Sequence, residues 1–238
     1  MWPLGYKFVR IQPENNNPKA ALLPFLGMLR QKGFAPAHIV DVGANRGNWT
    51  REAIRFFPDA RYTLVEPQDN LKCHIQDLLE RGYKIRWVHA GVADKPGKLP
   101  FSVSHRDDSS TFELSEEQAR RAGMPQVAVD VITLNDLASR LGAPPDLVKI
   151  DAEGFDLKVL AGATELLGKT EVFLVEAMVC SSSENTVERV INCMSESGYK
   201  LLDITDLNRS PKHGVLWSCE LAFLRNGSHL LDDVTSYE

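Results

Sequence analysis

Long apolar runs are absent from this sequence of 238 residues. Its most apolar early stretch, residues 20–29, is broken by Pro24, and nothing approaches the roughly 18 consecutive apolar residues that a membrane-spanning helix needs. The first residues also lack the basic stretch and the apolar run of a secretory signal peptide. We therefore expect no membrane span and a soluble, cytoplasmic protein.

Cysteine is scarce, and the four cysteines form no C-x-x-C pair. One of them is followed by His74, but no second Cys or His stands at metal-ligand spacing. The cysteine pattern therefore indicates neither a zinc site nor a dithiol redox motif. We expect small buried hydrophobic residues of a reducing compartment at Cys73, Cys180, Cys193 and Cys219.

Positive charge is also in short supply, with 27 Lys and Arg against 32 Asp and Glu and a net charge of −5. Such a chain has no general attraction to phosphate backbones, so nucleic acid is not an expected partner. The hydrophobic fraction of 43% and the charged fraction of 25% are typical of a globular protein. The length fits a single α/β domain.

Short apolar runs alternate with helical patterns along most of the chain, which is typical of parallel strands joined by helical crossovers. We expect an α/β fold with a doubly wound, mostly parallel, seven-stranded sheet that binds ligands at the carboxyl ends of its strands. The last two strands are joined by residues 205–215, which are too few for a crossover, so one antiparallel C-terminal strand is expected. The expected strands are 38–42, 62–65, 85–89, 146–151, 171–176, 199–204 and 216–224, and the expected helices 49–57, 70–80, 155–167 and 185–197.

The chain divides into an N-terminal arm (1–35), a main domain (36–226) and a polar C-terminal tail (227–238). Residues 95–131 interrupt the alternation, with two short strands (98–103 and 126–131) around a charged helix (115–122). A long polar insertion over the ligand edge of a sheet is typical of a lid or substrate loop. A solvated surface excursion would have the same composition.

A glycine-rich turn follows the first strand in the motif VDVGANRGNWT, residues 40–50. Gly43 and Gly47 allow close approach of the backbone, and Asn45 tolerates a left-handed conformation. The turn presents backbone N–H groups and a helix N-terminus to an anionic or polar ligand. Its spacing departs from the dinucleotide fingerprint G-x-G-x-x-G, because Asn45 and Asn48 stand at the second and third glycine positions.

Two carboxylates accompany this turn. Glu66 ends the second strand, where an acidic side chain can accept two ribose hydroxyls, and Asp41 would face a ligand's ammonium group. A ligand with ribose, ammonium and carboxylate but no pyrophosphate is S-adenosylmethionine. The alternatives are a solvent-facing strand end for Glu66 and a bracing role for Asp41.

A second acidic motif, LVKIDAEGFD, covers residues 147–156. At strand periodicity Asp151 and Glu153 point to one side, where one carboxylate suits a general base for a hydroxyl. The alternative is that Glu153 caps the next helix and Asp151 braces the cofactor turn. A metal held by these two and Glu176 is conceivable, but a third carboxylate at a strand tip is common without metal, and we expect none. His105 and His89 are reserve bases.

The motifs VDVGANRGNWT, VEP (65–67) and LVKIDAEGFDLKVLAGA (147–163) resemble the FkbM family of S-adenosylmethionine-dependent methyltransferases. The similarity spans about 39–176 and extends to the last strand. It implies a class I methyltransferase fold and O-methylation of small molecules or sugars. It also implies residue roles: methyl transfer at Asp151 and Glu153, paired serines at Ser109 and Ser110, and cofactor contacts at Asp41, Gly43, Asn45, Gly47 and Glu66. We also expect cofactor contacts at Thr50 and Asp151.

We therefore expect an S-adenosylmethionine-dependent O-methyltransferase whose partner is a small-molecule or carbohydrate acceptor. Arg106, with Ser109 and Ser110, would bind the acceptor, and a homo-oligomer is left open. An NAD-dependent oxidoreductase on the same architecture and a non-catalytic S-adenosylmethionine-binding protein are the alternatives. A nucleic-acid base methyltransferase is disfavoured, because the strand end at 150–153 lacks the usual N/D-P-P-Y/F pattern.

Overall fold

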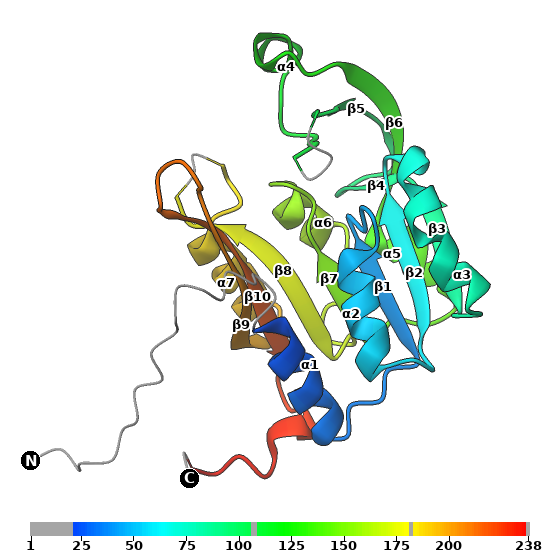
Figure 1. The fold of residues 1–238 in the computed structure, drawn as a ribbon. Helices are drawn as coiled ribbons and strands as arrows, with labels where there is room; N and C mark the ends of the chain where they lie inside the picture. The colour runs from blue at the N-terminus through cyan, green and yellow to red at the C-terminus, as the bar shows by residue number, and fades with distance from the viewer. Residues whose placement is uncertain (1–20, 106–108, 181–182, 237–238) are drawn as a thin grey trace, which may run out of the picture.

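A seven-stranded sheet forms the centre of the computed structural model, which describes residues 21–105, 109–180 and 183–236 (Figure 1). No helix of these residues has the length and apolarity that crossing a bilayer would take. The strands of the sheet are β1 (His38–Val42), β2 (Arg61–Glu66), β3 (Ile85–His89), β7 (Leu147–Ile150), β8 (Val172–Met178), β9 (Tyr199–Arg209) and β10 (Leu216–Arg225).

The strand order is β3-β2-β1-β7-β8-β10-β9. All neighbouring pairs are parallel except the two that β10 makes with β8 and β9. The predicted doubly wound sheet with one antiparallel C-terminal strand is therefore confirmed. The chain proceeds outward from β1 to β3 and then resumes at β7, so the switch point, where open α/β sheets bind ligands, lies between β1 and β7.

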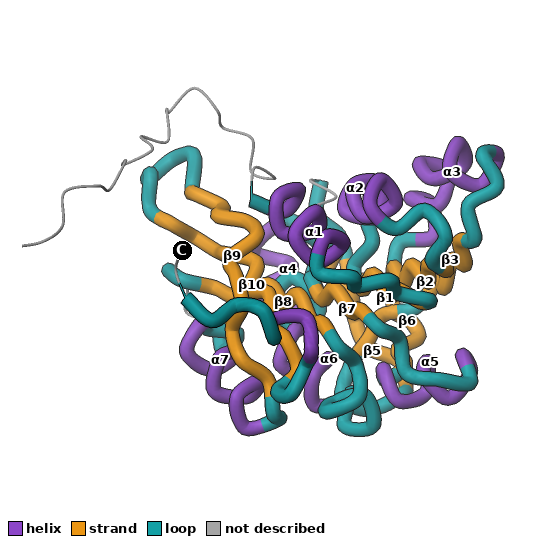
Figure 2. The backbone as a smooth tube through the Cα atoms, turned by 90° about the horizontal axis from the view of Figure 1, so that it is seen from below, coloured by secondary structure: helices purple, strands orange, loops and turns teal. Residues whose placement is uncertain are grey.

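Helices cover both faces of this sheet (Figure 2). Successive residues of β1 point to opposite faces, so Val40 and Val42 belong to one apolar cluster and Ile39 to the other. The first cluster lies under α5 (Leu134–Leu141), α6 (Asp156–Ala161) and α7 (Val187–Glu196). The second lies under α1 (Leu22–Gln31), α2 (Asn48–Phe56), a 3-10 helix (Asp69–Ile75) and α3 (Gln76–Glu80).

The insertion at 95–131 contains the two strands and the helix that its sequence predicts. They are β5 (Gly97–Ser102), α4 (Glu116–Ala122) and β6 (Gln126–Ile132). β6 pairs with β5 and, at its other edge, with β4 (Gly91–Val92), so the three form a second sheet in the order β4-β6-β5. In Figure 1 this small sheet stands beyond the carboxyl ends of the large one.

The helix α1 lies within the segment predicted as an N-terminal arm. Its residues Leu22, Phe25, Leu26 and Leu29 are buried in the core, at the i, i+3, i+4, i+7 spacing of one helix face. Leu230, from the predicted polar tail, is buried in the same cluster. The boundaries at residues 35 and 226 therefore leave two core segments outside the predicted domain.

Other elements depart from the sequence prediction in extent. The predicted helix 155–167 ends at Ala161, and a side chain on Gly162 would come within 2.3 Å of the Ala93 carbonyl oxygen. The helix α5 was not predicted. β9 continues to Arg209, so part of the predicted linker is strand. The expectation of buried cysteines is wrong for Cys73 and Cys180, which are exposed.

Candidate active site

A cavity of about 270 Å³ lies at the carboxyl ends of β1, β2, β3 and β7. The glycine-rich turn, the end of β2 and the turn after β7 form most of its wall. The small sheet contributes Phe101, the loop after β5 contributes Ser110 and Phe112, and β9 and β10 close the opposite side. Its polar lining residues include Asn45, Asn48, Glu66, Gln68, Ser110, Lys149, Asp151, Glu153, Thr205, Asp206 and Glu220.

The glycine-rich turn is shaped by protein neighbours. Gly43 has φ 71°, and a Cβ there would lie 1.9 Å from the carbonyl oxygen of Asp151. Gly47 has φ 72°, and its Cβ would lie 2.6 Å from the side chain of Ile75. Asn45 is left-handed, with φ 48°, as its residue type permits. Both glycines are thus required by packing, whatever ligand binds the turn.

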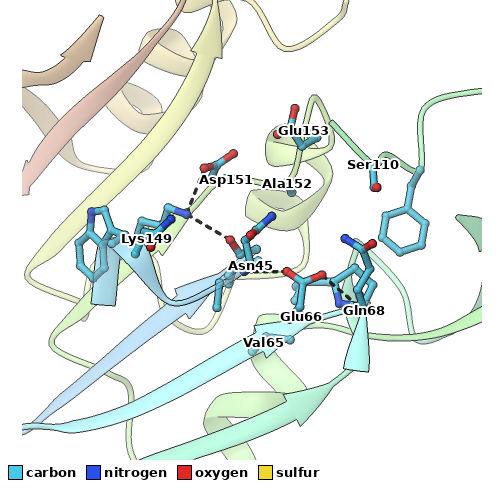
Figure 3. A pocket seen from close by; sticks show the side chains of 18 of the residues that line it. Asn45, Val65, Glu66, Gln68, Ser110, Lys149, Asp151, Ala152 and Glu153 are labelled. Atoms are coloured by element: carbon cyan, nitrogen blue, oxygen red, sulfur yellow. Dashed lines mark hydrogen bonds and ion pairs between the residues drawn. The ribbon is translucent and has the colours of Figure 1, made fainter. Parts of the chain in front are cut away.

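Glu66 projects from the end of β2 and is held by two backbone donors (Figure 3). The N–H of Asn45 donates to its Oε2 at 2.8 Å, and the N–H of Gln68 donates to its Oε1 at 3.0 Å. Burial raises the pKa of the Glu66 carboxyl, and these two donors oppose the rise. The carboxylate is therefore pre-oriented at the cavity wall, as recognition of hydroxyl donors requires.

Lys149 is a buried cation between two carboxylates. Its Nζ lies 3.4 Å from Asp41 Oδ1 and 3.1 Å from Asp151 Oδ2, and it also donates to the Gly43 carbonyl at 3.4 Å. Burial by itself lowers the pKa of the ammonium, but the charges of Asp151 and Asp41 raise it above its ordinary range. This cation ties the turn after β1 to the turn after β7.

Asp41 lies behind the cavity wall. Its side chain is fully buried, and Thr50 Oγ1 donates to its Oδ2 at 2.6 Å. Burial raises the pKa of this carboxyl, against the opposing effects of Lys149 and Thr50. Neither Asp41 nor Thr50, a predicted cofactor contact, lines the cavity, and this geometry favours the bracing role for Asp41.

The turn after β7 brings Asp151 and Glu153 to the cavity together (Figure 3). The Asp151 side chain is 37% exposed. Glu153 has a left-handed backbone, with φ 50°. Buried Asp156 holds this turn from below: its Oδ1 accepts the Ala152 N–H at 3.0 Å and its Oδ2 the Gly154 N–H at 3.2 Å.

Around the turn after β7, carboxyl groups outnumber cationic groups. Burial raises the pKa of Asp156 and of Glu220 to about 7 each, and burial followed by the charge of Asp151 raises that of Glu176. Lys149 is the one cationic side chain among the described lining residues. Within residues 21–105, 109–180 and 183–236, no group of three or more His, Cys, Asp or Glu is arranged to hold a metal ion.

The structure does not bring every predicted residue to the cavity. His105 is exposed, and His89 is exposed with its Nε2 3.0 Å from the Pro67 carbonyl oxygen. Ser110 lines the cavity on the side of Gln68 (Figure 3), whereas Ser109 does not line it. Arg106 lies outside the described residues.

Several residues that line the cavity were not predicted as site residues from the sequence. Thr205 and Asp206 fell in the predicted linker, and Leu22 in the predicted arm. Lys149 carried a signal that points to it: a lysine within the apolar run LVKI has no solvent to reach and requires a buried acid as its partner.

Similarity to known proteins extends over most of the chain. A curated relative, described as the 2-O-methyltransferase NoeI of Sinorhizobium fredii (strain NBRC 101917 / NGR234), is 26% identical over 151 residues. That match covers 58% of this chain and 62% of the relative, which is less than two thirds of the relative's length.

Two solved structures are similar in fold. The N-methyltransferase NodS of Bradyrhizobium japonicum WM9 superposes with a TM-score of 0.51 at 10% identity, covering 90% of this chain and 99% of its own. The magnesium protoporphyrin IX methyltransferase ChlM of Synechocystis PCC 6803, solved with bound SAM, gives a TM-score of 0.51 at 8% identity, covering 86% of this chain and 76% of its own. The model of the methyltransferase FkbM domain matches residues 41–201, which is more than half of the chain and includes the motifs described above except for Val40. This chain therefore belongs to the FkbM methyltransferase family.

Proposed function

We propose that the protein is an S-adenosylmethionine-dependent O-methyltransferase that acts on a hydroxyl of a small molecule or sugar. The observation that carries this proposal is the Glu66 carboxylate, buried at the cavity wall and oriented by two backbone N–H groups. The similarity to a 2-O-methyltransferase supports oxygen as the acceptor atom.

The residues of the cavity fit this cofactor. Each Glu66 oxygen accepts one backbone N–H, and a carboxylate has about four acceptor sites in all, so Glu66 can also accept a ribose hydroxyl. Val65, Val92 and Phe112 also line the cavity and would supply apolar surface for the adenine ring. Bound there, S-adenosylmethionine would supply a methyl group activated by its positively charged sulfur, and the surrounding carboxylates suit that charge.

The chain's own contribution to transfer is alignment and proton removal. A hydroxyl in the cavity meets Asp151 and Glu153, the two carboxylates of the turn after β7. Asp151 is committed to Lys149 at 3.1 Å and therefore orients the acceptor or the cofactor's amino group. Glu153 accepts the hydroxyl proton on a carboxylate oxygen as the O–H bond breaks, an effect of about 10²–10⁴-fold for a general base.

Calorimetric titration of the full chain with S-adenosylmethionine, S-adenosylhomocysteine and NAD tests the cofactor. We expect micromolar affinity for the first two. Glu66→Gln should weaken it roughly 10–100-fold, because a charge-assisted acceptor of hydroxyl donors is lost. Glu80→Gln, the same chemical change on exposed α3, is the matched control and should bind as the wild type does. Binding of NAD alone, or no binding of either adenosyl ligand, would contradict the proposal.

Acceptor chemistry is then tested with the cofactor-binding protein. Hydroxyl-bearing sugars and small polyols are incubated with S-adenosylmethionine, and a mass gain of one methyl group is sought. Glu153→Gln should abolish that gain while keeping the affinity for S-adenosylhomocysteine. If Glu153→Gln transfers methyl as fast as the wild type, the base is a different group; if no acceptor class is methylated while the cofactor binds, the non-catalytic alternative gains support.

A further inference from the structure

One peptide unit of the active-site turn lies between two left-handed residues. Glu153 has φ 50° and Gly154 has φ 93°. A non-glycine residue pays about 1–2 kcal/mol for this conformation, and it persists only where its surroundings impose it.

Side chains hold this peptide at both of its polar ends. Thr111 Oγ1 donates to the Glu153 carbonyl oxygen at 2.8 Å. At the other end, the Gly154 N–H donates to Asp156 Oδ2 at 3.2 Å. Rotation of the peptide plane would break both hydrogen bonds at once, so the two side chains form a clamp on a single peptide unit.

Each half of the clamp is anchored in a different part of the fold. Thr111 exchanges backbone hydrogen bonds with Ser102 of β5, which makes it part of the small sheet. Asp156 is held by the Asn185 side chain, whose Nδ2 lies 2.8 Å from Asp156 Oδ2 and 3.0 Å from the Glu176 carbonyl. The peptide is thus fixed from the insertion on one side and from the end of β8 on the other.

The insertion makes further contact with the same turn. A Cβ on Gly154 would meet the carboxylate of Glu113 at 2.4 Å, so the loop after Thr111 lies directly against Gly154. The Glu113 N–H donates to Thr111 Oγ1 at 3.0 Å, which leaves the hydroxyl proton of Thr111 directed to Glu153. Two flanking residues, Ser110 and Phe112, line the cavity.

We propose that Thr111 and Asp156 are positioning residues, which hold the Glu153–Gly154 peptide and so keep the Glu153 carboxylate at the cavity. The insertion then completes the active site through the Thr111 hydroxyl and does not merely cover it. This inference rests on the proposed function only for its catalytic consequence, because the clamp itself is measurable without a substrate.

The test compares Thr111→Val, which keeps the shape and removes the hydroxyl, with Thr111→Ser, which keeps the hydroxyl. Hydrogen–deuterium exchange is followed in peptides that cover residues 150–156 of the full chain. Loss of the Thr111 hydrogen bond should speed exchange there roughly fivefold. Thr111→Ser should restore the wild-type rate. The matched control, Thr164→Val at an exposed site, should leave these peptides unchanged.

The catalytic readout separates positioning from folding. With an acceptor in hand, Thr111→Val should lower kcat while leaving KM and the affinity for S-adenosylhomocysteine at wild-type values, and Thr111→Ser should recover kcat. Unchanged exchange in Thr111→Val, or exchange in Thr111→Ser as fast as in Thr111→Val, would overturn the clamp. Failure of the protein to bind adenosyl ligands would contradict the proposed function and leave the exchange result intact.

Discussion

Two turns meet at the switch point of the sheet, and they are held in different ways. Each contains one left-handed residue that is not glycine, Asn45 in the turn after β1 and Glu153 in the turn after β7. Glycines give the first turn its shape, because Gly43 and Gly47 leave room for neighbouring atoms. Side chains hold the second turn through hydrogen bonds, from Thr111 in the insertion and from Asp156 at the start of α6. Lys149 ties the two turns to each other.

The difference shows which interactions fix the conformation of each turn in an active site of this kind. A turn built from glycines tolerates no added atom, because neighbouring parts of the fold occupy the space that a side chain would need. A turn held by side chains keeps functional carboxylates in place, but it depends on partners such as Thr111, 42 positions away from Glu153 in the chain. The following substitutions test that contrast, from the largest expected effect to the smallest.

Removing the buried cation should have the largest effect. Lys149→Met leaves the Asp41 carboxyl buried without its ion pair, and we expect a loss of about 3–5 kcal/mol in the free energy of unfolding, measured by urea denaturation. Adding Asp41→Asn should recover part of the loss. Lys98→Met, which breaks the exposed pair with Asp130, is the control and should change stability little. Equal effects of the two lysine substitutions would contradict a charge-held turn.

Adding a side chain to the glycine-rich turn should have the second-largest effect on stability. Gly43→Ala places a methyl group 1.9 Å from the Asp151 carbonyl oxygen and forces alanine to φ 71°. We therefore expect the free energy of unfolding to fall by about 3 kcal/mol. The control is Gly142→Ala, where φ is a similar 81° but no atom lies within 4 Å of the added Cβ. Its free energy of unfolding should fall by only about 1 kcal/mol. Thermal denaturation of both variants isolates the effect of the overlap.

The charges around the second turn should make stability depend on pH. The pKa of Glu220 is about 7 in the fold against an ordinary value of 4.5, because burial disfavours its charged form. The folded state therefore binds this proton more tightly than the unfolded state, so its stabilising contribution is present at low pH and is lost as pH rises through about 7. As the pH is raised from 5 to 8, the free energy of unfolding of Glu220→Gln should increase by about 2–3 kcal/mol relative to that of the wild type. A difference independent of pH would contradict this.

Local patterns predicted the fold and pointed to several of the residues that line the cavity. Alternating runs and the short final linker were enough for the sheet and its antiparallel strand, since both depend on sequence periodicity and connection length. The motifs around Gly43, Glu66 and Asp151 were found because each stands at a strand end. The helix α1 was missed, because residues 1–35 were assigned to an arm as a whole, although Leu22, Phe25, Leu26 and Leu29 have helical spacing.

The rest of the site depends on tertiary contacts that no local pattern encodes. The hydroxyl of Thr111 reaches Glu153 only because β5 carries it there. Thr205 and Asp206 reach the cavity because β9 is longer than its apolar residues suggest. The bracing geometry of Asp41 follows from Lys149, whose position between two carboxylates is a property of the β1–β7 register.

The smallest effect should come from relieving backbone strain, and it compares the two turns directly. Glu153→Gly should raise the free energy of unfolding by about 1 kcal/mol, because glycine adopts φ 50° without the penalty that glutamate pays. Asn45→Gly should raise the free energy of unfolding by less, since asparagine tolerates the left-handed region of φ well. Both substitutions add the same backbone freedom to the unfolded chain. Asn45→Gly also removes the hydrogen bond that the Arg46 N–H donates to Asn45 Oδ1 at 2.7 Å, which reduces its gain further, and urea denaturation measures both variants. If Asn45→Gly stabilises as much as Glu153→Gly, the second turn stores no additional strain. If Glu153→Gly stabilises more while methyl transfer is lost, the strain is maintained by the clamp to hold a carboxylate where chemistry requires it.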